Sequence, residues 1–294
     1  MSKAHPPTFT AYIPIVFVLL WSTGFVGAKF GLPYAEPFTM LMWRMVFVVP
    51  LFVIFIVIFK RPKIRINEAI MQGVIGLLIH GFYLGGVFAA IYKGMPAGLA
   101  ALFVSLNPLL VAIFSGYVLK RKTTPQEWLG LSLGLLGVVV VLYGASSWGG
   151  VITWEGIAWL TLALVGICAG TLLQKRYAQN VDLITGSSYQ YGASLLFYTM
   201  LSFTVETGVV DWSMTFVFTL AWLIIVLSLI AVLLLLYMIR HGEAARVASY
   251  FYFVPPLTAF QGWLFFDEQW SWLTIAGAGL VIAALIISKP KIND

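Results

Sequence analysis

The chain has 294 residues, of which 61% are hydrophobic and 10% are charged, and its mean hydropathy is +0.96. Soluble domains carry about 25% charged residues, so this composition excludes a water-soluble surface and indicates an integral membrane protein. The single cysteine, Cys168, excludes an intramolecular disulfide framework and a multi-cysteine metal site. We expect neither a metal nor another cofactor.

Ten apolar stretches follow one another along the chain, separated by charged residues or by Pro, Gly and Asn. Each is close to the about 20 residues with which a helix crosses the hydrocarbon core. Helices are expected rather than strands, because lipid offers the backbone no hydrogen-bond partner. In chain order, the predicted spans cover residues 12–29, 37–59, 68–92, 96–119, 126–144, 154–175, 184–205, 215–239, 243–266 and 270–288.

The loops between these spans differ in charge from one side of the membrane to the other. One set of alternate loops holds only Lys29 and Lys93. The other set holds fourteen basic residues: Lys3, Lys60, Arg61, Lys63, Arg65, Lys120, Arg121, Lys122, Lys175, Arg176, Arg240, Arg246, Lys289 and Lys291. By the positive-inside rule, both termini are predicted to lie in the cytoplasm. Basic residues placed in short loops indicate membrane topology, so we expect no nucleic-acid partner.

The second half of the chain repeats the first. The stretch from Lys93-Gly94 to Pro108-Leu109 returns 148 residues later as His241-Gly242 to Pro256-Leu257. Five spans are an odd number, so the second copy enters the membrane from the opposite face. We therefore predict an all-α bundle of two inverted five-helix repeats, residues 1–146 and 147–294. Inverted halves are the geometric basis of alternating access in transporters.

Several motifs resemble one known family. They are W-S-T-G-F-V-G-A-K at Trp21–Lys29, Arg44 in the second span, the Gly-x-x-Ala to Pro stretches of spans four and nine, and the acidic turn Asp267-Glu268 before Trp270. Over nearly its whole length the chain resembles the drug/metabolite transporter superfamily, EamA type. Lys120-Arg121-Lys122 in the first half departs from the family's acidic turn.

Within that superfamily, the chain is most similar to the aromatic amino acid exporters of bacterial inner membranes, the YddG type. This resemblance implies export of Phe, Tyr, Trp or similar planar metabolites across the inner membrane, without a nucleotide site. The expected partners are therefore these small molecules and the lipid bilayer.

Polar side chains in the middle of a span are the candidates for substrate binding, because they are costly in lipid. His80 lies halfway along the third span, with Tyr83 one turn away, and its repeat partner in span eight is Ser228. The alternative for His80 is a packed imidazole hydrogen-bonded to a neighbour. Arg44 and Lys29 are predicted to be snorkelling or paired cations, and Arg44 alternatively to bind interior carbonyls.

Prolines mark a second group of candidates. Pro108 loosens span four around Phe103 and Asn107, and Pro255-Pro256 frees carbonyls in the aromatic run Tyr250 to Phe253. Trp21 lies in the middle of span one, where its indole N–H needs a partner. Interhelical packing is the alternative reading for these residues. The predicted substrate-binding residues are Trp21, His80, Tyr83, Phe103, Asn107, Ser228, Tyr250 and Tyr252, and no catalytic residue is predicted.

The sequence favours a facilitator. It has no Gly-x4-Gly-Lys-Ser/Thr loop for ATP, and every Asp and Glu falls in a loop or at a helix end. We expect downhill export by a monomer. A proton-coupled exporter of other small metabolites, such as aliphatic amino acids, nucleobases or drugs, stays open, as do a scaffold subunit and a membrane-embedded enzyme. The enzyme has no motif such as His-Glu-x-x-His to support it.

Overall fold

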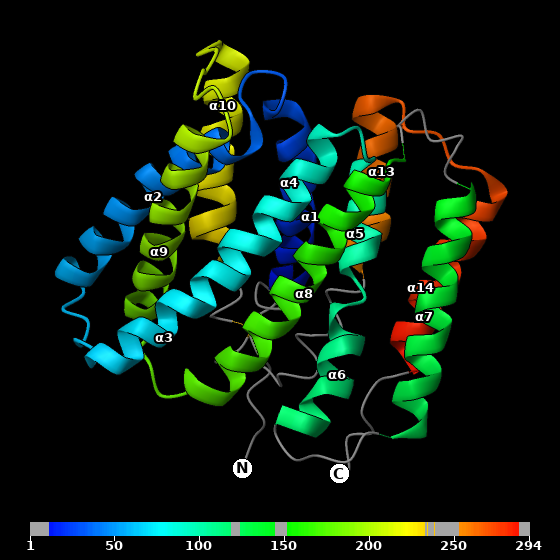
Figure 1. Ribbon diagram of the computed structural model, residues 1–294, viewed down its shortest axis with the longest axis horizontal. Helices are drawn as coiled ribbons and strands as arrows, with labels where there is room; N and C mark the ends of the chain where they lie inside the picture. Colours follow the sequence, from blue (N-terminus) through cyan, green and yellow to red (C-terminus); the bar gives the residue numbers. More distant parts are fainter. Residues whose placement is uncertain are drawn as a thin grey trace.

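The computed structural model describes residues 12–118, 124–144, 152–232, 234, 238 and 253–287. Within this part the chain is helical, and its one β contact is an isolated bridge between Ala35 and Val210 (Figure 1). The helices are α1 (Ile13–Gly31), α2 (Pro37–Ile58), α3 (Ile66–Gly76), η2 (Leu77–Tyr83), α4 (Leu84–Tyr92), α5 (Ala97–Val104), α6 (Asn107–Val118), α7 (Pro125–Gly144), α8 (Trp154–Tyr177), α9 (Leu183–Thr204), α10 (Met214–Trp222), η4 (Leu223–Ala231), α13 (Val254–Phe266) and α14 (Trp272–Ile287).

Five helical segments are long and apolar enough to cross a membrane: Ile13–Gly31, Pro37–Ile58, Ile66–Tyr92, Trp154–Tyr177 and Met214–Ala231. Three shorter apolar helices cover Ala97–Val111, Pro125–Val141 and Trp272–Ala284. These segments coincide with predicted spans, and the crossing of a membrane by all ten stretches stays a prediction. The helix break that Pro108 predicts is present, because α5 ends at Val104 and α6 starts at Asn107.

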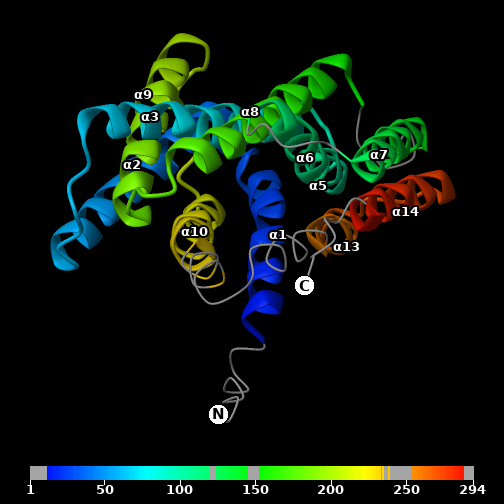
Figure 2. The same ribbon diagram turned by 90° about the horizontal axis from the view of Figure 1, so that it is seen from below.

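The strongest packing joins helices from the two halves of the chain. Helix α7 packs along α14 and α2 along α9, while α1 lies against α5, α13 and η4. Figures 1 and 2 show the α7–α14 pair at one side of the bundle and the α2–α9 pair at the other. A Cβ atom on Gly137 would come within 2.7 Å of the Gly277 carbonyl oxygen, so α7 and α14 meet backbone to backbone. The halves therefore form one interlocked bundle.

Two π-helical segments, η2 and η4, interrupt the α-helical geometry at related positions. They include His80 and Ser228, which are the two residues paired by the 148-residue repeat. π-Helical turns are rare and occur frequently at functional sites. The sequence did not predict them, but they single out the same pair of positions.

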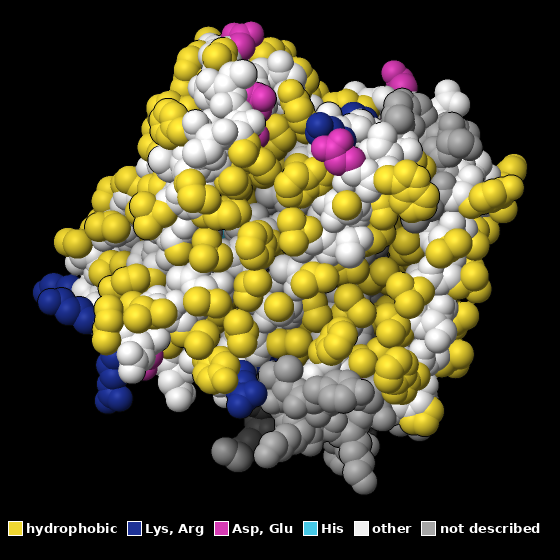
Figure 3. Space-filling model, in the orientation of Figure 1, with side chains coloured by type: hydrophobic (Ala, Val, Ile, Leu, Met, Phe, Trp, Pro, Cys, Tyr) yellow, Lys and Arg dark blue, Asp and Glu magenta, His cyan; other side chains and the backbone are white. Residues whose placement is uncertain are grey.

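Charged side chains gather at two opposite ends of the bundle (Figure 3). We call one the basic end; its described cations are Lys60, Arg61, Lys63, Arg65, Lys175 and Arg176. The other, the acidic end, carries Glu36, Glu155, Glu206 and Glu268 together with Lys29 and Lys93. The mostly apolar surface between the two ends has the character of a lipid-facing belt.

Carboxylates of the second half cap helices of the first half at the acidic end. Glu206 accepts hydrogen bonds from the backbone N–H groups of Phe38 (2.8 Å) and Thr39 (2.6 Å) at the start of α2. Glu268, only 2% exposed, accepts from Ala97 N at 2.9 Å at the start of α5. Helix N-termini leave N–H groups without partners and carry partial positive charge, so these caps fasten the halves together.

Lys29 completes the cap on α5. Its Nζ lies 2.7 Å from Glu268 Oε1, so the lysine that was predicted to be snorkelling or paired is paired. The same Nζ lies 4.4 Å from the ring centroid of Phe266. One buried carboxylate therefore joins α1, α5 and the turn between α13 and α14.

We predict that Glu268→Gln lowers the stability of the folded protein by about 1–3 kcal/mol, because Lys29 and the α5 N-terminus lose a charged acceptor in a buried position. The measurement is the apparent melting temperature of the purified protein in detergent. Glu155→Gln is the matched control, because the Lys93–Glu155 pair has exposed side chains (43% and 55%) and such pairs contribute little. An equal change in both variants would contradict this role of Glu268.

Candidate functional site

A buried polar cluster forms where α2, η2, α9 and η4 meet. At its centre is Arg44 of α2, whose side chain donates from Nε (3.1 Å) and Nη2 (3.0 Å) to the Ser228 hydroxyl. Ser228 in turn donates to the carbonyl of Leu223, 3.2 Å away. Arg44 is 6% exposed and Ser228 is fully buried. The prediction that Arg44 snorkels or pairs is therefore wrong for the described residues: the guanidinium stays inside and binds a hydroxyl.

Arg44 has no anionic partner within the described part of the chain. The ion pairs found there are Lys29–Glu268, Arg61–Asp182 and Lys93–Glu155. Buried charges are usually paired, and a guanidinium presents several N–H groups in a fork that suits a carboxylate. The guanidinium of Arg44 is therefore able to bind a further anionic group, one that is not among the described residues.

His80 lies close to Arg44 and stacks on a tyrosine of α9. The rings of His80 and Tyr191 are 4.2 Å apart at an interplanar angle of 18°. The hydroxyl of Tyr198 donates to the backbone carbonyls of His80 (2.5 Å) and Gly81 (2.8 Å). The hydroxyl of this tyrosine is shared by two carbonyls of the π-helical segment, and this contact helps to stabilise η2 inside the bundle. Tyr83, Tyr191 and Tyr198 all lie near the guanidinium.

Three glutamine side chains continue the cluster toward the basic end. Gln190 Nε2 donates to Gln72 Oε1 at 2.6 Å and to Gln174 Oε1 at 3.0 Å. Gln190 also lies beside the His80 imidazole. Polar contacts therefore run from α3 and α8 to the middle of the bundle.

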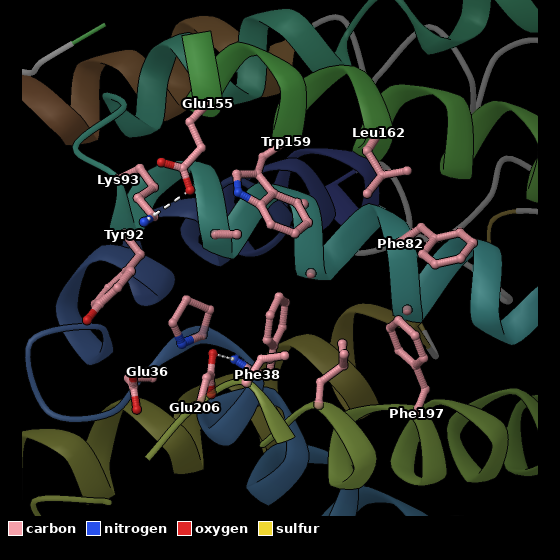
Figure 4. Close-up of a pocket in the computed structure, with 17 residues that line it drawn as sticks. Glu36, Phe38, Phe82, Tyr92, Lys93, Glu155, Trp159, Leu162, Phe197 and Glu206 are labelled. Carbon is pink, nitrogen blue, oxygen red and sulfur yellow. Dashed lines mark hydrogen bonds and ion pairs between the residues drawn. The ribbon is translucent and has the colours of Figure 1, made fainter. Parts of the chain in front are cut away.

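A cavity of 490 Å³ lies next to this cluster, between α4, α8, α9 and the start of α2; we call it the lateral groove. Figure 4 shows charged side chains at one end and aromatic rings at the other. Its lining residues are Glu36, Pro37, Phe38, Gly81, Phe82, Gly85, Gly86, Ala89, Tyr92, Lys93, Glu155, Trp159, Leu162, Phe197, Leu201, Val205 and Glu206. Phe38 stacks on Tyr198 with centroids 6.2 Å apart, so an aromatic layer separates the groove from the polar cluster.

The structure brings together only some of the predicted site residues. His80, Tyr83 and Ser228 surround Arg44, as described above. Trp21 lies on α1, half-buried and 5.3 Å from the ring of Phe17. None of the six predicted residues that the structure describes lines the lateral groove. Tyr250 and Tyr252 lie outside the described residues.

Phe103 and Asn107 flank the break between α5 and α6. Phe103 is 8% exposed in the core, and the side-chain Oδ1 of Asn107 is buried without a hydrogen-bond partner among the described residues. Helix α1 packs against both η4 and α5, and Figure 2 shows α5 on one side of α1 and α10, which continues into η4, on the other. Phe103 and Asn107 form a separate group rather than part of the Arg44 cluster.

Gln190, Tyr191 and Tyr198 are the members of the cluster that the sequence analysis missed. All three lie inside the predicted span 184–205, where a polar side chain is costly. The argument that selected His80 also applies to Gln72 and Gln190. Within the described residues, no group of three or more His, Cys, Asp or Glu side chains could hold a metal ion.

Comparison with known proteins gives a family match over most of the chain. The model described as the EamA-like transporter family matches residues 9–143 and 154–288. An uncharacterized transporter, YvbV, from Bacillus subtilis is 24% identical over 98% of this chain and 94% of the relative. The uncharacterized inner membrane transporter YedA of Escherichia coli K12 is 24% identical, with 92% of this chain and 87% of the relative covered.

Two further matches concern activity and fold. A probable amino-acid metabolite efflux pump of Escherichia coli K12 is 23% identical over 94% of this chain and 93% of the relative. A solved structure described only as a crystal structure of a protein superposes with a TM-score of 0.65 at 17% identity, and covers 96% of this chain and 97% of the other. That structure shows a shared fold.

Glu206 generates a prediction about pH. Burial raises the pKa of the Glu206 carboxyl, and the nearby charge of Glu36 adds to the rise, while hydrogen bonds from Phe38 and Thr39 oppose it. A raised pKa means that the folded protein binds the Glu206 proton more tightly than the unfolded chain does. The stability that the protonated carboxyl contributes is therefore lost as the pH rises through the pKa of the folded state.

Glu206→Gln removes this titration. We expect the melting temperature of the variant minus that of the wild type to increase as pH rises from about 5 to about 8. Thermal unfolding across that range measures the difference, with Glu68→Gln at the basic end as control. A difference that does not change with pH would refute the assignment.

Proposed function

Because this chain belongs to the EamA-like transporter family, we propose that it exports aromatic amino acids and related small amphipathic metabolites by alternating access. The family, the named inner membrane transporters and efflux pumps among its relatives, and five long apolar segments make it a multi-pass transporter of the inner membrane. The substrate class and the mechanism go beyond this assignment.

The observation that carries the proposal is the buried Arg44, which has a hydroxyl but no described carboxylate as its partner. A carboxylate can bind a guanidinium through two parallel hydrogen bonds, which is a strong and directional contact. An amino acid supplies such a carboxylate. Arg44 would therefore bind the carboxylate of the substrate.

The surroundings of Arg44 support an aromatic side chain on the substrate. The His80–Tyr191 stack places aromatic rings beside the guanidinium, and Tyr191 stacks in turn on Phe52, 5.2 Å away. Aromatic pairs contribute about 0.5–1.5 kcal/mol beyond the area that they bury. Tyr83 and Ser228 would complete the site with hydroxyl groups.

The remaining predicted residues belong to the pathway in this proposal. Asn107 has a buried amide oxygen that finds no donor among the described residues, and the ammonium group of a substrate would satisfy it. Trp21 and Phe103 would offer apolar contacts on either side. Tyr250 and Tyr252 remain proposed substrate-binding residues.

The proposed topology has ten spans, with inverted halves at residues 1–146 and 147–294 and both termini in the cytoplasm. Its support is the separation of charge between the two ends of the bundle, because the positive-inside rule favours a basic end at the cytoplasmic face. Exchange of conformation between the halves would then open the Arg44 site to either side.

A facilitator is the favoured mode of transport, and the monomer is the proposed unit. The described carboxylates lie in loops or near helix ends, so the middle of the bundle offers no described Asp or Glu to carry a coupling proton. Proton-coupled efflux of a wider range of metabolites is the second candidate. It is favoured by His80, a titratable group that lies at the centre of the cluster.

The substrate proposal predicts a charge-specific effect of Arg44. In liposomes containing the purified protein, Arg44→Gln should weaken the apparent affinity for phenylalanine by about ten- to a hundredfold, since charge-assisted hydrogen bonds contribute about 1.5–3 kcal/mol. Phenethylamine lacks the carboxylate, so its transport should not respond to the substitution. Lys63→Gln in a loop at the basic end is the matched control.

An unchanged KM for phenylalanine in a folded Arg44→Gln variant would remove Arg44 from the binding site. Folding is checked by gel filtration and melting temperature. Equal losses for phenylalanine and phenethylamine would mean that the residue supports the structure rather than the carboxylate.

A separate experiment tests the mode of transport. We expect labelled phenylalanine to exchange across the liposome membrane without a pH gradient, driven by its own gradient. The initial rate with and without an imposed gradient is the measurement, with protein-free liposomes as control. Transport that occurs only with the gradient would establish proton coupling instead.

A further inference from the structure

The lateral groove lies on the outer surface of the bundle rather than in its interior. Leu162 of α8 and Val205 after α9 flank it with 37% and 62% of their surface exposed. The face of the molecule that carries α8 and α9 is mostly apolar between the two ends (Figure 3). In a membrane protein such a surface contacts lipid, so the groove is open to the bilayer.

The groove has an apolar part and a charged part. Phe82 and Phe197 meet edge to face, 5.5 Å apart, at one end, and Trp159 lies midway. The wall between them is formed by small residues of η2 and α4, including Gly85 and Gly86. A long apolar chain can lie along this wall, and the volume of 490 Å³ is in the range of ligand sites, about 300–1,000 Å³.

The charged part carries an excess of carboxylates. Glu36 accepts hydrogen bonds from the backbone N–H and the hydroxyl of Thr207, and Glu206 from the start of α2. All these donors are neutral, and neither carboxylate belongs to an ion pair among the described residues. Across the groove, Lys93 Nζ lies 3.0 Å from Glu155.

We propose that the lateral groove binds a phospholipid with a terminal ammonium head group, such as phosphatidylethanolamine. The ammonium group lies between Glu36 and Glu206, and the phosphate faces Lys93. One acyl chain runs toward the Phe82–Phe197 pair. The head group carries both charges, and the charged part of the groove offers Lys93 on one wall and the two carboxylates on the facing wall (Figure 4).

The chemistry of the charged part selects this head group over the other common ones. An anionic head such as that of phosphatidylglycerol carries no cation for the two carboxylates, which repel it, and only Lys93, already paired with Glu155, attracts its phosphate. The quaternary ammonium of phosphatidylcholine has no N–H to donate, whereas a primary ammonium donates charge-assisted hydrogen bonds. The site does not depend on the proposed substrate or on Arg44.

Native mass spectrometry of the full chain in detergent tests the proposal. Phosphatidylethanolamine, phosphatidylglycerol and phosphatidylcholine with the same acyl chains are offered in equal amounts. We expect one phosphatidylethanolamine to be retained in preference to the other two. Glu36→Gln should lower its affinity about tenfold, while Glu68→Gln, at the basic end, leaves it unchanged.

A second pair of variants tests the apolar part without changing charge. Leu201→Trp fills the groove and should prevent retention of the lipid. Leu196→Trp, on the same helix but 74% exposed and outside the lining, should not. Equal retention of the three lipids, an unchanged affinity in Glu36→Gln, or equal loss in both tryptophan variants would overturn the proposal.

Competition with soluble compounds separates a lipid site from a substrate vestibule. Phenylalanine or phenethylamine at saturating concentration should leave the bound lipid in place. Displacement by either compound would overturn the lipid assignment and identify the groove as part of the transport path. Loss of transport in Arg44→Gln with normal lipid binding would keep the two sites distinct.

Discussion

Hydrocarbon offers no hydrogen bonds, so each polar group in the middle of this bundle must find its partner within the protein or in a ligand. That constraint accounts for the contacts around η2 and η4. The π-helical geometry of η2 directs two carbonyls at the hydroxyl of Tyr198, and the Ser228 hydroxyl both accepts from Arg44 and donates to Leu223. The polar cluster is therefore a set of side chains that complete each other's hydrogen bonds, and Arg44 is the member with donors to spare.

The same constraint is weaker at the ends of the bundle. There, carboxylates of the second half bind the N-termini of helices in the first half. Glu206 and Glu268 cap α2 and α5 across the halves with short contacts from carboxylate to N–H. Water can replace the Glu206 carboxylate at the start of α2, which is close to the surface, so that cap can break and reform at modest cost. The Glu268 cap is buried and costs more to open. In the middle of the bundle no water-rich surface is at hand, so contacts there change only when another polar group enters.

The sequence predicts features that depend on a single segment better than features that depend on packing between segments. Apolar length and charge placed the helices, and Pro108 marked the break between α5 and α6, because these are properties of one segment at a time. The 148-residue repeat paired His80 with Ser228, and both lie in π-helical segments. Tyr191 and Tyr198 escaped notice because their role depends on which face of α9 meets η2, whereas Gln190 could have been selected as a polar side chain inside a span, as His80 was. The face of α9 that meets η2 is decided by packing between segments, and the lateral groove is a property of packing alone.

The separation between wet ends and a dry middle gives the proposed transport cycle a physical order. Opening the acidic end requires α2 and α5 to leave Glu206 and Glu268, and water supplies the freed N–H groups with partners there. Arg44 is buried in the polar cluster, where a carboxylate is the group that suits its donors best. In the proposed cycle, a substrate carboxylate would therefore stabilise the interior in either arrangement of the halves. The end caps would decide which side is open, and the Arg44 cluster would decide which substrates pass.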